Sequence, residues 1–166
     1  MIHIFFYGGL PMWILLIFFI YGIIIILDRI NTLGKKMEML PQQKEYLAKK
    51  YSSAKNYQLQ FDAEIANQKK ALSNKMYLLK LLAFIAPMFA IILALGEISI
   101  QLINIKTAQA QITTNDFYTM AIRLLLPVHF GIVISAILGG CYLILTNKIK
   151  DYLTSLILVN IEKQKR

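Results

Sequence analysis

The chain has 166 residues, of which 57% are hydrophobic and 16% are charged, and its formal net charge is +9. Soluble domains usually carry about 25% charged residues, so this composition excludes an ordinary water-soluble domain and indicates an integral membrane protein. The basic residues lie between and after long apolar runs. There they are interpreted as topology signals and as contacts with anionic lipid, and not as a nucleic-acid surface.

The first 27 residues contain no acidic or basic side chain apart from histidine, and residues 8–27 are predicted to form a first membrane span. About 20 apolar residues are enough to cross a hydrocarbon core of ~30 Å. A secretory signal peptide is the competing interpretation, but no basic segment precedes this run and no small-residue cleavage site follows it. Arg29, Lys35 and Lys36 follow instead, which favours a cytoplasmic end here and an N-terminus outside.

Residues 35–77 form a polar segment that is rich in lysine. From Gln42 onward strong helix formers dominate, and apolar residues recur at roughly helical spacing. We expect a cytoplasmic helix that continues straight into the second span. Its lysines are interpreted as a solvated face near an anionic leaflet.

The second predicted span, residues 78–103, contains Pro87 and a single acid, Glu97. A charge-poor segment, residues 104–116, follows it and fits an outside loop. An ionisable side chain inside a span is costly, so Glu97 is a candidate functional residue.

The third predicted span, residues 117–146, contains Arg123, Pro127 and His129. Three small residues, Gly131, Ser135 and Gly139, then follow at intervals of four. Such spacing lets two helix backbones approach closely, so these residues are expected to pack helices together.

The predicted fold is an all-α membrane protein with three transmembrane helices, an N-terminus outside and long helices that extend into the cytoplasm. Basic residues follow the first and third spans, so both basic blocks lie on one side of the membrane. The chain is divided into four segments. Residues 1–34 hold the first span, and residues 35–77 form a basic cytoplasmic part. Residues 78–147 hold the second and third spans with their short outer loop, and residues 148–166 form a basic tail.

Glu97 and Arg123 each lie about six residues below the outer end of their spans, or about 9 Å deep. Because these helices run in opposite directions, the sequence predicts an ion pair, within one subunit or between neighbours. In the alternative, each side chain reaches the interface separately, which a long arginine does more readily than a glutamate. The sequence also leaves open that Glu97 is protonated, because burial of a carboxyl group disfavours its charged form.

His129 lies about 18 Å from the outer end of its span, near the bilayer midplane. It is either a hydrogen-bonded packing residue or a proton relay, since imidazole titrates near neutral pH. His3 is the only other histidine, and the sequence shows no metal-ligand cluster, phosphate loop or catalytic motif. No metal, cofactor or enzymatic activity is therefore expected. The single cysteine, Cys141, is interpreted as a small packing residue.

Several motifs, in order, carry a family resemblance. Residues 8–13 read Gly-Gly-Leu-Pro-Met-Trp, and an acid–arginine pair at residues 28–29 closes the first span. Residues 86–87, Ala-Pro, follow a lysine-rich segment, and Gly131 opens a run of small residues. Together these motifs resemble the ExbB/TolQ/MotA proton-channel family, and the three-span pattern is most similar to ExbB and TolQ.

The resemblance implies a homopentamer in the energised inner membrane of a bacterium. The pentamer would enclose a dimer of a single-span partner like ExbD, TolR or MotB, whose aspartate carries the ion. Anionic lipids are the other expected partner. Ion flow would drive work on the envelope, and the process served stays open among outer-membrane uptake, envelope maintenance, motility and secretion.

The chain also departs from the family pattern. Alignment on residues 86–87 and Gly131 places two channel-facing threonine positions of the family at Ala94 and Val128, and an acid position at Arg123. Glu97 stands where relatives often have glycine, and it is interpreted as a substitute for the missing acid through its pairing with Arg123. Sodium is disfavoured as the ion, because hard cations require several oxygen ligands.

The sequence therefore predicts a proton-channel motor subunit that acts through a partner. The competing hypothesis is a pentameric membrane scaffold that has lost the ion pathway, and a third is a simple anchor or holin-like protein. Pro87, Gly131 and Gly139 are assigned to helix packing or kinking. The candidates for the ion pathway are Glu97, His129, Arg123, Ser135, Ala94 and Val128.

Overall fold

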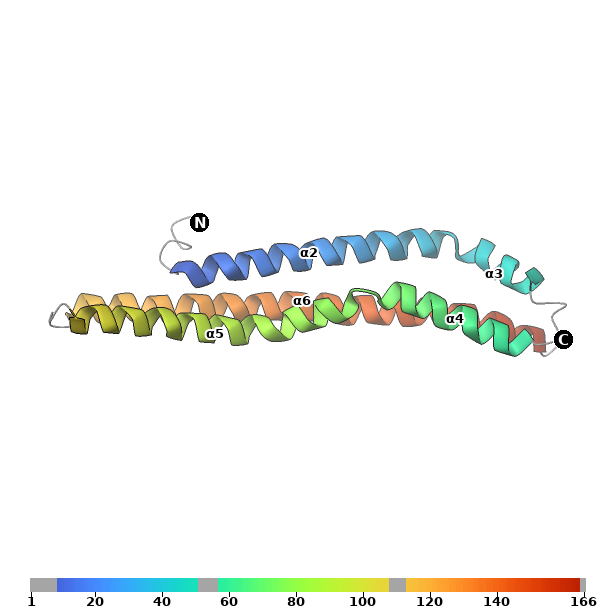
Figure 1. The fold of residues 1–166 in the computed structure, drawn as a ribbon. Coiled ribbons are helices and arrows are strands. Elements are labelled where there is room, and N and C mark those ends of the chain that lie inside the picture. Colours follow the sequence, from blue (N-terminus) through green and yellow to red (C-terminus); the bar gives the residue numbers. More distant parts are fainter. Residues whose placement is uncertain (1–8, 51–56, 108–112, 165–166) are drawn as a thin grey trace. The chain divides into compact units, whose positions relative to one another are not determined.

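The computed structural model describes residues 9–50, 57–107 and 113–164, and all the secondary structure in these residues is helical (Figure 1). This result confirms the predicted all-α fold. The helices are α2 (Gly9–Glu38), α3 (Leu40–Lys50), α4 (Tyr57–Ser73), α5 (Met76–Thr107) and α6 (Thr114–Gln164).

Among the described residues, three helical stretches are long and apolar enough to cross a membrane, and they contain the second and third predicted spans and residues 9–27 of the first. They extend over Gly9–Glu38, Gln58–Thr107 and Thr114–Leu158. In an apolar segment of 18 residues from each stretch, the share buried within the chain is only 33%, 28% and 22%, in the order of the stretches. Most of this apolar surface therefore remains to be covered by lipid or by another protein chain.

The chain divides into two compact units. Unit 1 comprises residues 1–24 and 78–140, and unit 2 comprises residues 25–77 and 141–166. Unit 1 thus holds the first part of α2, nearly all of α5 and the first half of α6. Unit 2 holds the rest of α2 and α6 together with α3 and α4.

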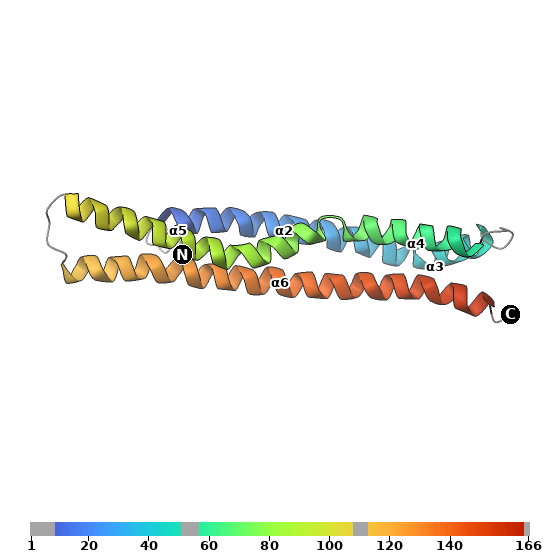
Figure 2. The ribbon, with the colours of Figure 1, turned by 60° about the horizontal axis from the view of Figure 1, so that its bottom comes forward.

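Unit 1 is built around a contact between small side chains of α5 and α6, which lie side by side in Figures 1 and 2. A stripe of buried alanines runs along α5 at intervals of three and four residues, as expected for one face of a helix: Ala83, Ala86, Ala90 and Ala94. A Cβ atom added at Gly131 of α6 would lie 2.7 Å from the Ala90 Cβ and 3.1 Å from the Ala86 carbonyl oxygen. Glycine at position 131 is therefore required for this approach of the two backbones.

Unit 2 has a core of large apolar side chains, among them Leu33, Phe61, Leu72 and Leu156, which are each at most 5% exposed. The basic tail predicted from residue 148 onward continues α6 without interruption as far as Gln164.

One expectation about unit 2 was wrong. The polar segment does not continue straight into the second span, because α4 ends at Ser73 and α5 begins at Met76. Lys75, between them, has a φ of 63°, in the left-handed region that interrupts a right-handed helix. The polar segment also contains a separate helix, α3, before the break.

Candidate functional site: an ion pair at the start of α2

Glu97 of α5 and Arg123 of α6 form an ion pair in unit 1, with 3.2 Å between Oε1 of the glutamate and Nη1 of the arginine. The Arg123 side chain is 34% exposed and that of Glu97 is 21% exposed. The ion pair expected from the sequence is therefore present, and it forms within one chain. Pairing offsets the cost of placing either charge in an apolar surrounding.

The second carboxylate oxygen of Glu97, Oε2, is buried and has no hydrogen-bond partner among the described residues. An ionised carboxylate accepts several hydrogen bonds, and leaving a buried acceptor unpaired costs about 1–3 kcal/mol. A proton bound at Oε2 would neutralise the carboxylate and end the attraction to Arg123. Among the described residues, the carboxylate is thus paired on one oxygen and unpaired on the other.

The start of α2 lies against this carboxylate. Gly9 has a φ of 67°, and a Cβ atom added there would overlap with the carboxylate group of Glu97. The N-terminus of a helix carries a partial positive charge, which stabilises a neighbouring anion. The Glu97 carboxylate is therefore contacted from two different helices, by Arg123 of α6 and by the start of α2 at Gly9.

His129 does not join this group. Its side chain is exposed on α6, and its Nδ1 atom lies 2.8 Å from the carbonyl oxygen of Leu125. Because the carbonyl only accepts, Nδ1 must carry the proton, and Nε2 of the neutral ring remains an acceptor. Six residues, or about 9 Å along α6, separate it from Arg123. The hydrogen bond matches one part of the first interpretation, but the exposed side chain does not pack within this chain. The second interpretation, a proton relay, stays a prediction.

The remaining pathway candidates occupy different environments. Ala94 is 0% exposed and belongs to the alanine stripe, so within this chain its side chain faces the interior of unit 1. Val128 and Ser135 are half-buried on α6. Gly139 is in ordinary contact with α5, since a Cβ there would lie 3.9 Å from the Ala83 Cβ.

Both prolines of the spans lie inside uninterrupted helices. Pro87 contributes to the close approach in unit 1, since its Cα atom would lie 3.2 Å from a Cβ added at Gly131. Pro127 of α6 is fully buried. Among the described residues, no three His, Cys, Asp or Glu side chains gather closely enough to hold a metal ion. His3 lies outside the described residues.

A second polar cluster, in unit 2, surrounds Arg29 of α2. Its side chain donates from Nη1 to the carbonyl oxygen of Ala71 at 3.2 Å and from Nη2 to Oδ2 of Asp28 at 2.9 Å. Lys75 pairs with the same Asp28 oxygen at 3.4 Å. The hydrogen bond from Arg29, with a further contribution from Lys75, holds the pKa of Asp28 below its ordinary value.

Arg29 thus acts as a cap for α4, because Ala71 lies in the last turn of that helix, where carbonyl groups lack partners within the helix. The negative end of the helix dipole also attracts the guanidinium. The sequence alone marked residues 28–29 as a topology signal and a family motif. The capping role was missed because it depends on a contact across 42 positions.

Comparison with protein families, with characterised proteins and with solved structures finds no match. In the residues that the structure describes, the protein is all-helical, with three helical stretches able to cross a membrane and an ion pair, Glu97–Arg123, between the second and third of them.

Proposed function

We propose that this chain is a subunit of a proton-driven motor of the ExbB/TolQ type, assembled as a homopentamer in a bacterial inner membrane. In this arrangement its N-terminus lies outside and its basic segments lie in the cytoplasm. The observation that carries the proposal is the environment of Glu97: one carboxylate oxygen is bonded to Arg123, and the other is buried and has no partner in the part of the chain that the structure describes. A carboxylate so placed binds and releases a proton with a large change in its interactions.

The proposed cycle uses the two states of this pair. With Glu97 ionised, Arg123 is held by the carboxylate and its charge is compensated. When Oε2 takes up a proton, Arg123 loses its counter-ion and attracts an acid from another chain instead. The aspartate of a single-span ExbD-, TolR- or MotB-like partner is the acid that the proposal assigns to this role. Loss of the proton restores the internal pair and releases the partner.

The exposed surface of the spans is consistent with assembly. Within the chain, the apolar segment of the first stretch is 33% buried, and those of the second and third stretches are 28% and 22% buried. A pentamer around a central partner would cover part of this surface, and lipid would cover the rest. His129, exposed on α6, would be a relay residue if that face lines the pathway.

The test is proton flux through liposomes that contain the chain and its partner, for the wild type and for Glu97→Gln. Glutamine keeps the size of the side chain and removes the titratable group. We expect flux to fall to background while the pentamer, measured by native mass spectrometry, stays intact. Glu64→Gln, on α4 in unit 2, is the matched control and should conduct normally. Wild-type flux in Glu97→Gln would remove Glu97 from the mechanism.

A second candidate function is a pentameric scaffold that does not conduct. The enclosed position of Ala94 favours it, because Ala94 stands where the family resemblance places a channel-facing hydroxyl and its side chain faces the interior of unit 1. The same liposome measurement separates the two functions. A pentamer with bound partner and no flux under a proton gradient would support the scaffold.

A further inference from the structure

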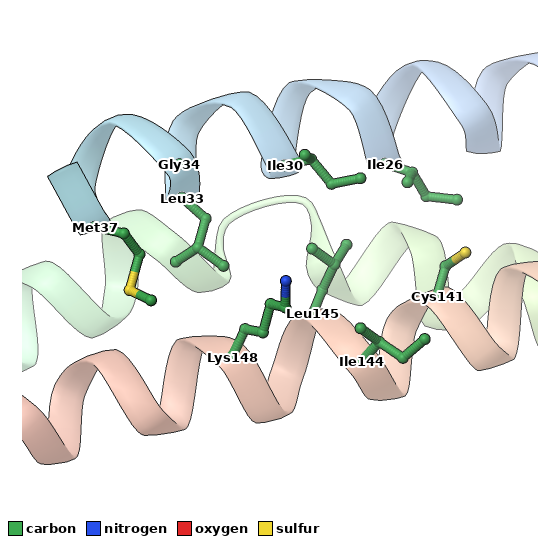
Figure 3. Close-up of a pocket in the computed structure, with 9 residues that line it drawn as sticks. All are labelled: Ile26, Ile30, Leu33, Gly34, Met37, Cys141, Ile144, Leu145 and Lys148. Carbon is green, nitrogen blue, oxygen red and sulfur yellow. The ribbon is translucent and has the colours of Figure 1, made fainter.

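A groove of about 440 Å³ lies within unit 2, between α2 and α6 (Figure 3). Apolar side chains form nearly all of its wall, among them Ile26 and Leu33 of α2 and Leu145 of α6. Its one charged lining residue is Lys148, whose side chain extends from α6 toward α2 in Figure 3. The groove is therefore an apolar channel with a single cation on its wall.

Gly34 of α2 also lines the groove, and a Cβ atom added at this position would meet no heavy atom within 4 Å. The space beside position 34 is therefore open, and a larger side chain can be placed there. Among the residues that the structure describes, Lys148 takes part in no ion pair. The cation is thus available to an anionic ligand.

The position of the groove along the chain matches the edge of a bilayer. Ile26 belongs to the predicted first span, residues 8–27, whereas Lys148 follows the end of the predicted third span at residue 146. Ile30, Leu33 and Met37 of the same wall follow the end of the first span, so the apolar wall crosses the edge of the bilayer and Lys148 lies near the depth of the head groups. An apolar wall with a lysine beside it is the pattern of a lipid site.

The dimensions separate an acyl chain from a protein helix. From Ile26 to Met37 the groove follows α2 for about 17 Å at a rise of ~1.5 Å per residue. A helix is about 10–12 Å wide, so a single turn of ~5.4 Å occupies roughly 400–600 Å³, about as much as the whole groove. A volume of about 440 Å³ spread over three turns of α2 is too narrow for a helix from a second copy.

We propose that this groove binds one anionic phospholipid, with an acyl chain against the apolar wall and the phosphate beside Lys148. The ammonium of Lys148 neutralises the phosphate, and the apolar side chains remove the acyl chain from contact with other lipids. The site requires that the chain lies in a bilayer, but it does not depend on proton conduction by Glu97. Failure of either proposal leaves the other standing.

Cys141 gives a direct probe, because it lines the groove and is the only cysteine in the chain. The experiment measures the rate at which N-ethylmaleimide modifies Cys141 in the full-length protein in mild detergent. Dioleoylphosphatidylglycerol is added in one series and dioleoylphosphatidylcholine in the other. We expect the anionic lipid to slow modification roughly fivefold more than the zwitterionic lipid, the preference expected from one basic residue.

Two variants test the assignment of the groove. Lys148→Gln should remove the difference between the two lipids, whereas Lys150→Gln, an equal charge change on α6 outside this groove, should retain it. Gly34→Leu should also remove the difference, because it fills the groove and leaves Lys148 in place. Circular dichroism of each variant verifies folding.

Three outcomes would overturn the proposal. Equal protection by both lipids would show that the phosphate charge is not recognised. Protection of Cys141 that rises with protein concentration and does not depend on the added lipid would show that a second copy covers the groove. A lipid difference that persists in both Lys148→Gln and Gly34→Leu would place the anionic lipid elsewhere.

Discussion

Lys75 and Asp28 form an ion pair across 47 positions of the sequence, with 3.4 Å between Nζ and Oδ2, and Lys75 adopts a φ of 63° where α4 gives way to α5. The residue that breaks the helix is thus tied to another helix, α2. The left-handed backbone at position 75 favours glycine, whereas the ion pair with Asp28 requires a basic side chain such as lysine.

These two preferences can be separated by substitution. Lys75→Gly relieves the left-handed backbone and loses the ion pair, whereas Lys75→Ala loses the ion pair and keeps the backbone cost. Since that cost is about 1–2 kcal/mol, the glycine variant should be more stable than the alanine variant by this amount. Thermal unfolding of the full-length protein in detergent, followed by circular dichroism, measures the difference. An alanine variant as stable as the glycine variant would contradict the left-handed conformation.

Gly9 offers a test of the contact between α2 and the carboxylate of Glu97. Gly9→Ala should destabilise the protein by at least about 1–2 kcal/mol, because the added Cβ meets the carboxylate and the positive φ is unfavourable for alanine. Gly96→Ala is the matched control, since position 96 is open and interior to α5, and it should be neutral or stabilising by up to about 1 kcal/mol. The cost of Gly9→Ala should shrink in a Glu97→Ala background, and a double-mutant cycle measures this coupling. Additive effects would argue against the contact.

Gly131 and Gly140 provide a second matched pair, both on α6. A Cβ at position 131 would meet the backbone and side chain of α5, whereas a Cβ at position 140 would meet nothing within 4 Å. Gly131→Ala is therefore expected to destabilise the protein by about 1–3 kcal/mol, and Gly140→Ala is expected to leave it unchanged or more stable. Chemical or thermal unfolding of the two variants side by side checks the prediction. The reverse order would mean that α5 and α6 do not meet at Gly131.

Tyr152 of α6 is fully buried in unit 2, with its hydroxyl beside the side-chain amides of Gln43 and Gln68. The hydroxyl lies within hydrogen-bond distance of Oε1 of both amides and donates its one proton to either of them. Tyr152→Phe should cost about 1–3 kcal/mol, since this hydrogen bond is lost. Tyr77→Phe, at a side chain 71% exposed, is the control and should change stability little.

The same tyrosine predicts a loss of stability at alkaline pH. Burial raises the pKa of Tyr152 above its ordinary value of 10.0, so the folded state retains the phenol proton longer than the unfolded chain does. Its contribution is fully present below pH 10.0 and is lost as the pH rises toward the folded-state pKa. Melting temperatures of wild type and Tyr152→Phe, measured across this range, should converge as the pH rises. A constant difference would show that the phenol does not titrate differently in the two states.

The spans and the Glu97–Arg123 pair could be predicted from the sequence because both follow from counting residues along regular helices. Apolar length defines a span, and equal depth on antiparallel helices places two charges side by side. The Gly9 contact could not be predicted in this way, because it depends on which face of α2 meets α5. The end of α4 at Ser73 was also missed, since Asn74 and Lys75 are ordinary helix residues by propensity and the break is stabilised by Arg29 and Asp28 from α2.

The small residues between α5 and α6 have a mechanical consequence. Alanine and glycine have no side-chain rotamers to rearrange, so the two backbones meet directly and have no soft layer between them. A push on one helix is therefore passed to its neighbour with little lost to side-chain motion. Where these small residues meet, α5 and α6 are therefore expected to move together as one rigid body.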